Sequence, residues 1–189
     1  TTSKLTFGYT STQYTMTALG TEVFWPATNS PAKLFVLSGT GVDFNSITRT
    51  IADTFFVAAN IKRYCTLTFN GVVAINPGAV YDAGTICVNG PFYGCTSTLK
   101  YNTGGTWTRG NEWRAGGTIG NLEIFNSTTV NGNIGNGITC NDLTIGTGSK
   151  LYMDNGGSVT SSLTVGRDLK VYGTLNLGAK SGGDLIVGR

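Results

Sequence analysis

The chain has 189 residues and a net charge of +3 at pH 7, and 12% of its residues are charged, about half the usual ~25%. It contains no histidine, which excludes catalytic triads and metal sites that depend on an imidazole. A hydrophobic fraction of 40% is too high for a disordered chain, and so small a net charge gives no electrostatic footprint for nucleic acid.

Short triplets with an apolar first and third residue recur along the chain, and each predicts a strand whose alternate side chains face inward. In chain order, the triplets that recur 19 to 22 residues apart are Leu34–Val36 with Phe55–Val57, Leu67–Phe69 with Ile86–Val88, and then Leu122–Ile124, Leu143–Ile145, Leu163–Val165 and Leu185–Val187. The segments between them are rich in Gly, Asn, Asp and Ser, which supply tight turns. No segment keeps a helical apolar period for three turns, so the prediction is all-β.

Strands of three residues need neighbours to be stable. Three of them joined by turns make one coil of about 20–22 residues, and stacked coils pair each strand in parallel with its counterpart one coil earlier, at ~4.8 Å. The sequence therefore predicts a parallel β-solenoid, or β-helix, which is right-handed because parallel crossovers almost always are. Its core is predicted to consist of stacked rows formed by Leu34, Val36, Phe55, Val57, Leu122, Ile124, Leu143, Ile145, Leu163, Val165, Leu185 and Val187.

A longer repeat of 88 residues, which separates Trp25 from Trp113, lies above the coil repeat. Four coils nearly fill it. We therefore expect a first repeat unit at 1–95, a second at 96–184 and the start of a third at 185–189, with the chain an excerpt of a longer array. Because the two tryptophans occupy matching positions, both are predicted to be structural aromatics that cover the apolar edge of a coil.

The four cysteines are compatible with an oxidising compartment. Cys87 and Cys95 flank a short segment, so a disulfide that closes this loop is predicted, with two inward thiols acting as small hydrophobes as the alternative. A pairing of Cys65 with Cys87 or Cys95 on a neighbouring coil also stays open, because sequence alone does not fix connectivity. Cys140 is expected to stay apart from Cys65. With no histidine and no CxxC pair, a zinc site is not expected.

Three acidic residues, Asp142, Asp168 and Asp184, each directly precede a strand triplet. One interpretation is an acidic ladder that binds calcium or serves as a polysaccharide lyase site, since Asp142 and Asp184 are 42 residues apart. Ser162 occupies the position between them, and calcium usually needs about six or more oxygen ligands. The favoured interpretation is an Asp that closes a turn by bonding to its own backbone. No catalytic residue, metal ligand or cofactor is predicted.

Two further interpretations concern the surface. Trp107, Tyr101 and Tyr172 are candidates for a strip on which sugar rings stack. Hydroxyl positions such as Thr6 and Thr68 raise ice binding by a flat solenoid face, but the threonines are not expected to recur at the coil period on one face. The scattered basic residues Lys62, Arg63, Arg109 and Arg114 are expected on the solvated surface.

The segment Thr98–Trp113, which reads TLKYNTGGTWTRGNEW, is similar to one that recurs in large secreted proteins of Bacteroidota. Asn121–Gly132 and Ser181–Leu185 resemble the Leu-x-Ile strands and Val-Asn-Gly turns that follow it there. The resemblance implies a β-solenoid stalk of a giant surface protein. Proteins that look like this typically carry a C-terminal sorting domain and leave the cell through the type IX secretion system, and several are gliding-motility adhesins. The family supplies no catalytic residues.

These observations predict a secreted, non-enzymatic stalk or fibre segment of an adhesin-like protein at the cell surface. The chain begins with Thr1 rather than methionine, so we expect a removed leader or a longer parent protein. Expected partners are further copies of the same repeat through end-to-end self-association, the secretion and outer-membrane machinery, and surface glycans; nucleic acid is not expected. The alternatives are a carbohydrate-binding or carbohydrate-active β-helix, and an ice-binding solenoid.

Overall fold

The structure, a computed structural model, describes residues 3–7, 14–15, 31–37, 41–45, 48–62, 66–82, 91–110, 112–113, 118–132, 138–153, 162–177 and 185–188. Within these ranges every regular element is a strand, and no helix is present that could cross a membrane. The strands are β1 (Lys4–Phe7), β2 (Tyr14–Thr15), β3 (Lys33–Val36), β4 (Val42–Asp43), β5 (Arg49–Ile51), β6 (Thr54–Val57), β7 (Asn60–Lys62), β8 (Leu67–Phe69), β9 (Val72–Ile75), β10 (Val80–Asp82), β11 (Phe92–Tyr93), β12 (Thr98–Tyr101), β13 (Thr106–Thr108), β14 (Thr118–Ile124), β15 (Thr129–Asn131), β16 (Ile138–Ile145), β17 (Lys150–Tyr152), β18 (Leu163–Val165), β19 (Leu169–Val171), β20 (Thr174–Asn176) and β21 (Leu185–Val187).

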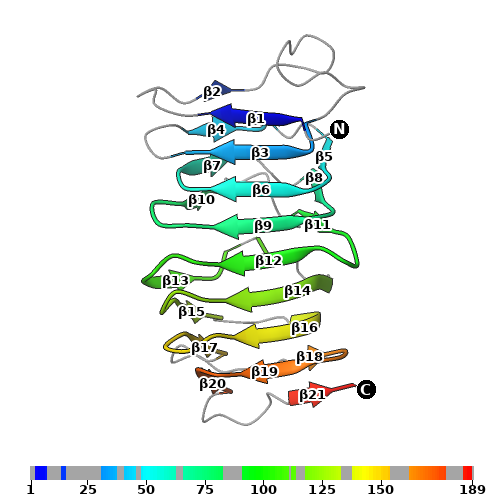
Figure 1. The fold of residues 1–189 in the computed structure, drawn as a ribbon, viewed down its shortest axis with the longest axis vertical. Helices are drawn as coiled ribbons and strands as arrows, with labels where there is room; N and C mark the ends of the chain where they lie inside the picture. Colours follow the sequence, from blue (N-terminus) through cyan, green and yellow to red (C-terminus); the bar gives the residue numbers. More distant parts are fainter. Residues whose placement is uncertain are drawn as a thin grey trace.

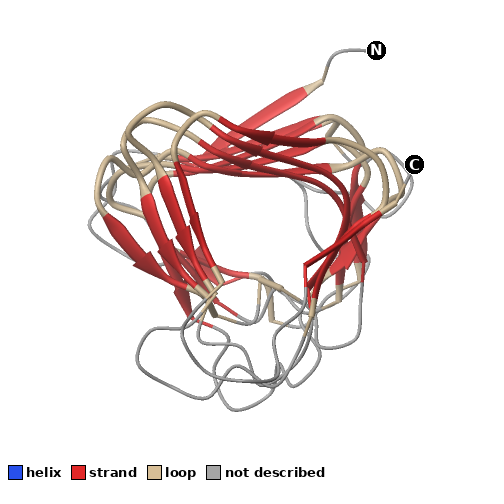
Figure 2. Ribbon diagram, turned by 90° about the horizontal axis from the view of Figure 1, so that it is seen from below, coloured by secondary structure: helices blue, strands red, loops and turns tan. Residues whose placement is uncertain are grey.

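These strands stack in one column, with β1 near one end and β21 at the other (Figure 1). The largest sheet has ten strands in the order β1-β3-β6-β9-β12-β14-β16-β18-β21, and β19 also pairs with β16. Neighbouring strands run parallel, as in β3–β6 and β14–β16. Viewed along the column, the strands line three sides of one outline (Figure 2). The predicted fold, a parallel β-solenoid, is confirmed.

Each coil passes through three faces in turn. The first face contains β1, β3, β6, β9, β12, β19 and the C-terminal parts of β14 and β16. The second face contains two four-stranded sheets, β2-β4-β7-β10 and β13-β15-β17-β20. The third face contains β5-β8-β11, the N-terminal parts of β14 and β16, and then β18 and β21.

Coil length varies along the column. Successive partners on the first face are 29 residues apart between Leu5 and Leu34 but 18 apart between Phe55 and Val73. The interval of 21 expected from the triplets holds between Leu34 and Phe55. The insertions fall between strands, where extra residues do not disturb the ladder.

The interior is a continuous apolar core, because the strands alternate inward apolar and outward polar residues. Ten of the twelve residues predicted to form it are fully buried, at 0% exposure: Leu34, Val36, Phe55, Val57, Leu122, Ile124, Leu143, Ile145, Leu163 and Val165.

The predicted row that joins Leu143 to Leu163 is wrong. Leu143 pairs with Leu169 on the first face, whereas Leu163 pairs with Ile138 on the third face. Both Leu163 and Leu169 begin apolar-x-apolar triplets and they lie six residues apart, so spacing alone selected the wrong one. Both triplets still contribute to the core, since each face of the solenoid presents its own inward row.

Leu185 and Val187 keep the predicted register with Leu163 and Val165, but they are 37% and 47% exposed rather than buried. A solenoid core is closed only where a coil lies on each side of a strand. Within the described residues β21 has one ladder partner, β18, which leaves its side chains open to solvent.

The predicted unit boundary after residue 95 coincides with no break in the first face, where β9 and β12 pair directly. On the second face, in contrast, β10 ends one described sheet and β13 begins the next. The division into 1–95, 96–184 and 185–189 stays a prediction.

Candidate functional site

The most elaborate polar cluster in the described chain surrounds a fully buried carboxylate, that of Glu112. Its Oε1 accepts hydrogen bonds from the Tyr101 hydroxyl at 2.7 Å and from the Trp107 indole Nε1 at 3.0 Å. The Gly110 amide donates to both carboxylate oxygens, at 3.0 and 2.8 Å. Tyr93 donates to the Glu112 carbonyl at 2.8 Å. Such bonds offset the cost of burying a charge.

Arg109 and Trp113 complete this cluster. The Arg109 guanidinium lies 5.2 Å from the centre of the Trp113 ring, and its Nη2 donates to the Trp113 carbonyl at 3.4 Å. Burial lowers the pKa of Arg109, and the Glu112 charge opposes that shift. The prediction of Arg109 as solvated surface is therefore wrong, because the aromatic ring and the buried carboxylate hold its head group against the core.

Trp113 is buried and packs edge to face on Tyr101, with ring centroids 6.2 Å apart, in keeping with the structural role expected of it. Its predicted counterpart, Trp25, lies outside the described residues. We call Tyr93, Tyr101, Trp107, Arg109, Glu112 and Trp113 the Glu112 cage.

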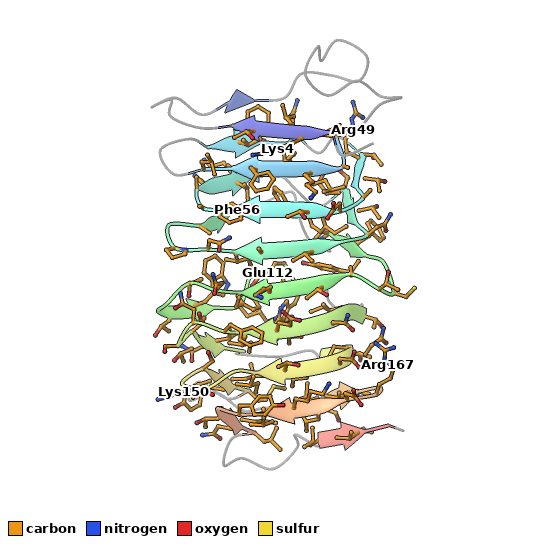
Figure 3. The ribbon with its side chains drawn as sticks, viewed as in Figure 1. Lys4, Arg49, Phe56, Glu112, Lys150 and Arg167 are labelled. Atoms are coloured by element: carbon orange, nitrogen blue, oxygen red, sulfur yellow. The ribbon has the colours of Figure 1, made fainter. Side chains whose placement is uncertain are left out.

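The cage joins β11, β12 and β13 to the segment that precedes β14, where the described ladders of the second face are interrupted. Figure 3 places Glu112 at mid-height in the column. Its carboxylate is buried and already bound by three donors, so it offers no open position to a substrate. Its chemistry is that of an anchor that draws the loop onto the core.

The predicted sugar-stacking strip of Trp107, Tyr101 and Tyr172 does not form. Tyr101 is buried inside the coil and Trp107 is half-buried against it, with ring centroids 6.1 Å apart. Tyr172, in contrast, is 67% exposed and follows β19 near the opposite end of the column. Sequence spacing identified aromatic residues but not which side of their strands they occupy.

Two of the three predicted acidic residues meet at the corner between the third and first faces. Because Leu143 pairs with Leu169, Asp142 and Asp168 take neighbouring positions, and Ser162 does not lie between them as predicted. Arg167 holds Asp142 through Nε–Oδ1 and Nη2–Oδ2 contacts of 3.1 and 2.8 Å.

The Asp168 amide also donates to Asp142 Oδ1 at 3.2 Å, so Asp142 does cap backbone, that of the next coil. Asp168 pairs with Lys170 at 3.3 Å. Each carboxylate thus has a basic partner, and the arrangement is a clasp between coils. Asp184 lies outside the described residues, within which no group of three or more acidic, Cys or His residues could hold a metal ion.

The first face repeats such clasps along the column. Lys33 pairs with Asp53 at 3.3 Å, and Lys100 pairs with Glu123 at 3.4 Å, each across neighbouring coils. A hydrogen bond from Thr54 and the Lys33 charge hold the pKa of Asp53 below its usual value, against a small opposing effect of desolvation. Exposed pairs of this kind contribute little individually, but their spacing sets a charge pattern on this face.

The cysteines form no reactive centre in the part of the chain that is described. Cys140 is buried, and burial, with a smaller effect of Asp142, raises its pKa to about 12, so its thiolate is scarce at neutral pH. Cys95 is an exposed free thiol. Cys87 and Cys65 lie outside the described residues, and the Cys87–Cys95 disulfide stays a prediction.

The third face carries an outward row of threonines that the sequence reading missed. Thr118, Thr139 and Thr164 are successive register partners, and Thr50 and Thr68 pair in the same way nearer the N-terminus. The expectation that threonines do not recur on one face is wrong, because Thr118 to Thr139 spans 21 residues and Thr139 to Thr164 spans 25. A fixed period cannot detect a row whose coils differ in length.

This face is also uncharged. The charged residue of its described strands is Arg49, which is buried. No hydrogen bond to the five threonine hydroxyls occurs within the described residues. The third face therefore presents regularly spaced methyl and hydroxyl groups, about 4.8 Å apart along the column, in contrast to the charged first face.

The chain matches no family model, no curated protein and no solved structure. A solenoid fold by itself does not define a function, so function is argued from the surfaces and contacts above.

Proposed function

We propose that the chain is a structural segment, a stalk or fibre, of a secreted adhesin-like protein displayed at the cell surface and exported by type IX secretion. The observation that carries the proposal is the continuous ten-stranded parallel sheet, which links the coils from β1 to β21. The resemblance of Thr98–Trp113 to segments of large secreted Bacteroidota proteins supports the setting and the export route.

A rod needs stiffness between its coils, and three features supply it. The ladder bonds of the first face run along the column axis. The core forms one cluster from Leu34 to Val165. Ion pairs such as Arg167–Asp142 connect neighbouring coils on the outside. Stability in such arrays is the sum of coil stabilities and interfaces between neighbours.

The proposed role is mechanical rather than enzymatic. Asp142 and Asp168 are held by Arg167 and Lys170, and the Glu112 carboxylate is enclosed by its donors, so we assign no general acid or base. Release of reducing or unsaturated sugars from a polysaccharide, lost in Asp142→Asn, would overturn this and favour a carbohydrate-active β-helix.

The stalk is tested in the full-length native protein by replacing residues 1–189 with a Gly/Ser linker of equal residue number. A flexible linker keeps the connection but spans a shorter and variable distance. We expect surface display to persist and adhesion to a distant surface to fall. Unchanged adhesion and unchanged height of the terminal part above the cell would contradict the stalk.

A second candidate, an ice-binding face, is favoured by the uncharged threonine row of the third face. The test is ice-growth inhibition by the isolated chain and by Thr139→Lys, with Thr144→Lys as the matched control, since Thr144 points outward from the first face of the same strand. Inhibition that is lost only in Thr139→Lys would support this candidate. Absence of inhibition in the unaltered chain would eliminate it.

A further inference from the structure

Exposed apolar side chains concentrate at one end of the column. Seven large hydrophobic residues of the described chain are exposed, and five of them, Val171, Tyr172, Leu185, Ile186 and Val187, lie on or beside β19 and β21. Single exposed apolar residues are ordinary. Five together along unpaired strand edges form a surface that proteins normally cover.

The two ends of the first face carry matching strands. At one end, β19 has Leu169 and Val171 in register with the inward residues of β16. At the other end, β1 has Leu5 and Phe7 packed against the core and Lys4 and Thr6 exposed. Within the described residues each of these strands has one ladder partner, β16 and β3 respectively.

We infer that a second copy of this chain stacks head to tail on the first, with its β1 adding to β19 in the register that places Leu5 beside Leu169 and Lys4 beside Asp168. This inference rests on the proposed role as a rod segment and specifies the partner and the contact. The inward row of the first face then continues from Leu143 through Leu169 into Leu5 of the next copy.

The charges favour this register. Lys4 of the second copy would meet Asp168, which repeats the inter-coil pairs Lys33–Asp53 and Lys100–Glu123 already present on the first face. Opposite charges on neighbouring strands stabilise a pairing and like charges destabilise it.

Other registers are penalised. A slip by one residue turns Lys4 inward and Leu5 outward, which exchanges the two faces of the strand. A slip by two residues towards the C-terminus keeps the alternation but places Lys4 beside Lys170. The inferred register is therefore selected by both apolar pattern and charge.

Charge reversal tests the contact. We expect the unaltered chain to associate with rising concentration in sedimentation velocity at low salt, and Lys4→Asp and Asp168→Lys each to raise the dissociation constant about tenfold. Mixing the two variants should restore association, because the reversed charge at position 4 of one variant then meets the reversed charge at position 168 of the other. Lys150→Asp, an exposed position on the second face, is the matched control and should have no effect.

Cross-linking gives a second readout. Lys4 and Arg167, the neighbour of Asp168, lie towards opposite ends of the column (Figure 3), so a zero-length carbodiimide link between Lys4 and Asp168 can form only between copies. Peptide mass spectrometry should detect this link in the unaltered chain.

The outcomes separate this inference from the proposed function. Association that is insensitive to both reversals, without the Lys4–Asp168 link, would overturn the register while leaving the stalk in place. A strict monomer at high concentration would overturn head-to-tail stacking altogether. The linker replacement in the full-length protein tests the stalk independently of either result.

Discussion

The buried carboxylate of Glu112 provides the sharpest test of how the middle of the solenoid is held together. Glu112→Gln preserves the shape, but its amide nitrogen cannot accept the bond that the Gly110 amide donates at 2.8 Å. The bonds that remain are neutral rather than charge-assisted, and such bonds are roughly half as strong. We therefore expect Glu112→Gln to lower the free energy of unfolding by about 2 kcal/mol.

Glu112→Ala is the more severe change. It leaves the Tyr101 hydroxyl, the Trp107 indole and the Gly110 amide without the acceptor they share. A buried donor without a partner costs about 1–3 kcal/mol, so the loss should be at least about 3 kcal/mol. The order of stability should be unaltered chain, then Glu112→Gln, then Glu112→Ala.

The measurement is urea unfolding followed by tryptophan fluorescence, since Trp107 and Trp113 both belong to the cage. Glu123→Gln is the control, because Glu123 makes an exposed pair with Lys100 and should cost less than about 1 kcal/mol. If Glu112→Gln and Glu112→Ala were no less stable than Glu123→Gln, the cage would not anchor the loop and the reasoning would fail.

Three further changes probe the corner, the thiols and the core. Gly120→Ala should destabilise strongly, because its Cβ would lie 2.3 Å from the Ser97 carbonyl oxygen, whereas Gly105→Ala meets nothing within 4 Å and should be tolerated; thermal melting of both variants checks the difference. With a pKa of about 12, Cys140 should resist alkylation of the native chain at pH 8 while the exposed Cys95 reacts, and equal labelling in a mass spectrum would contradict its burial. Ile145→Asn places an unpaired amide in the core and should cost several kcal/mol in urea unfolding, so a loss below about 1 kcal/mol would mean that the row is not packed.

The sequence predicted the architecture because apolar alternation and turn residues act locally. A triplet such as Leu122–Ile124 indicates a strand, and a coil interval of about 21 residues indicates stacking. The prediction failed where assignment depended on coil length. Leu163 and Leu169 begin equivalent triplets, and only the register places them on different faces.

The functional surfaces were harder to predict than the fold. Nothing in the local pattern around Glu112 signals that the loop turns inward, although an isolated acid beside Trp113 was a clue to a buried anchor. The threonine row escaped detection because insertions between strands change the interval from one coil to the next. Orientation of a side chain in a loop depends on contacts between coils, which sequence spacing does not record.

Pulling the chain from its two ends in a single-molecule force experiment tests the stacked rod most directly. Coils of 18 to 29 residues, at about 3.5 Å per extended residue, should be released in discrete steps of roughly 60–100 Å, because each coil is held by its neighbours. Complete extension should approach roughly 650 Å for 189 residues. Smooth extension from the lowest forces, with no steps, would contradict a rod built from stacked coils.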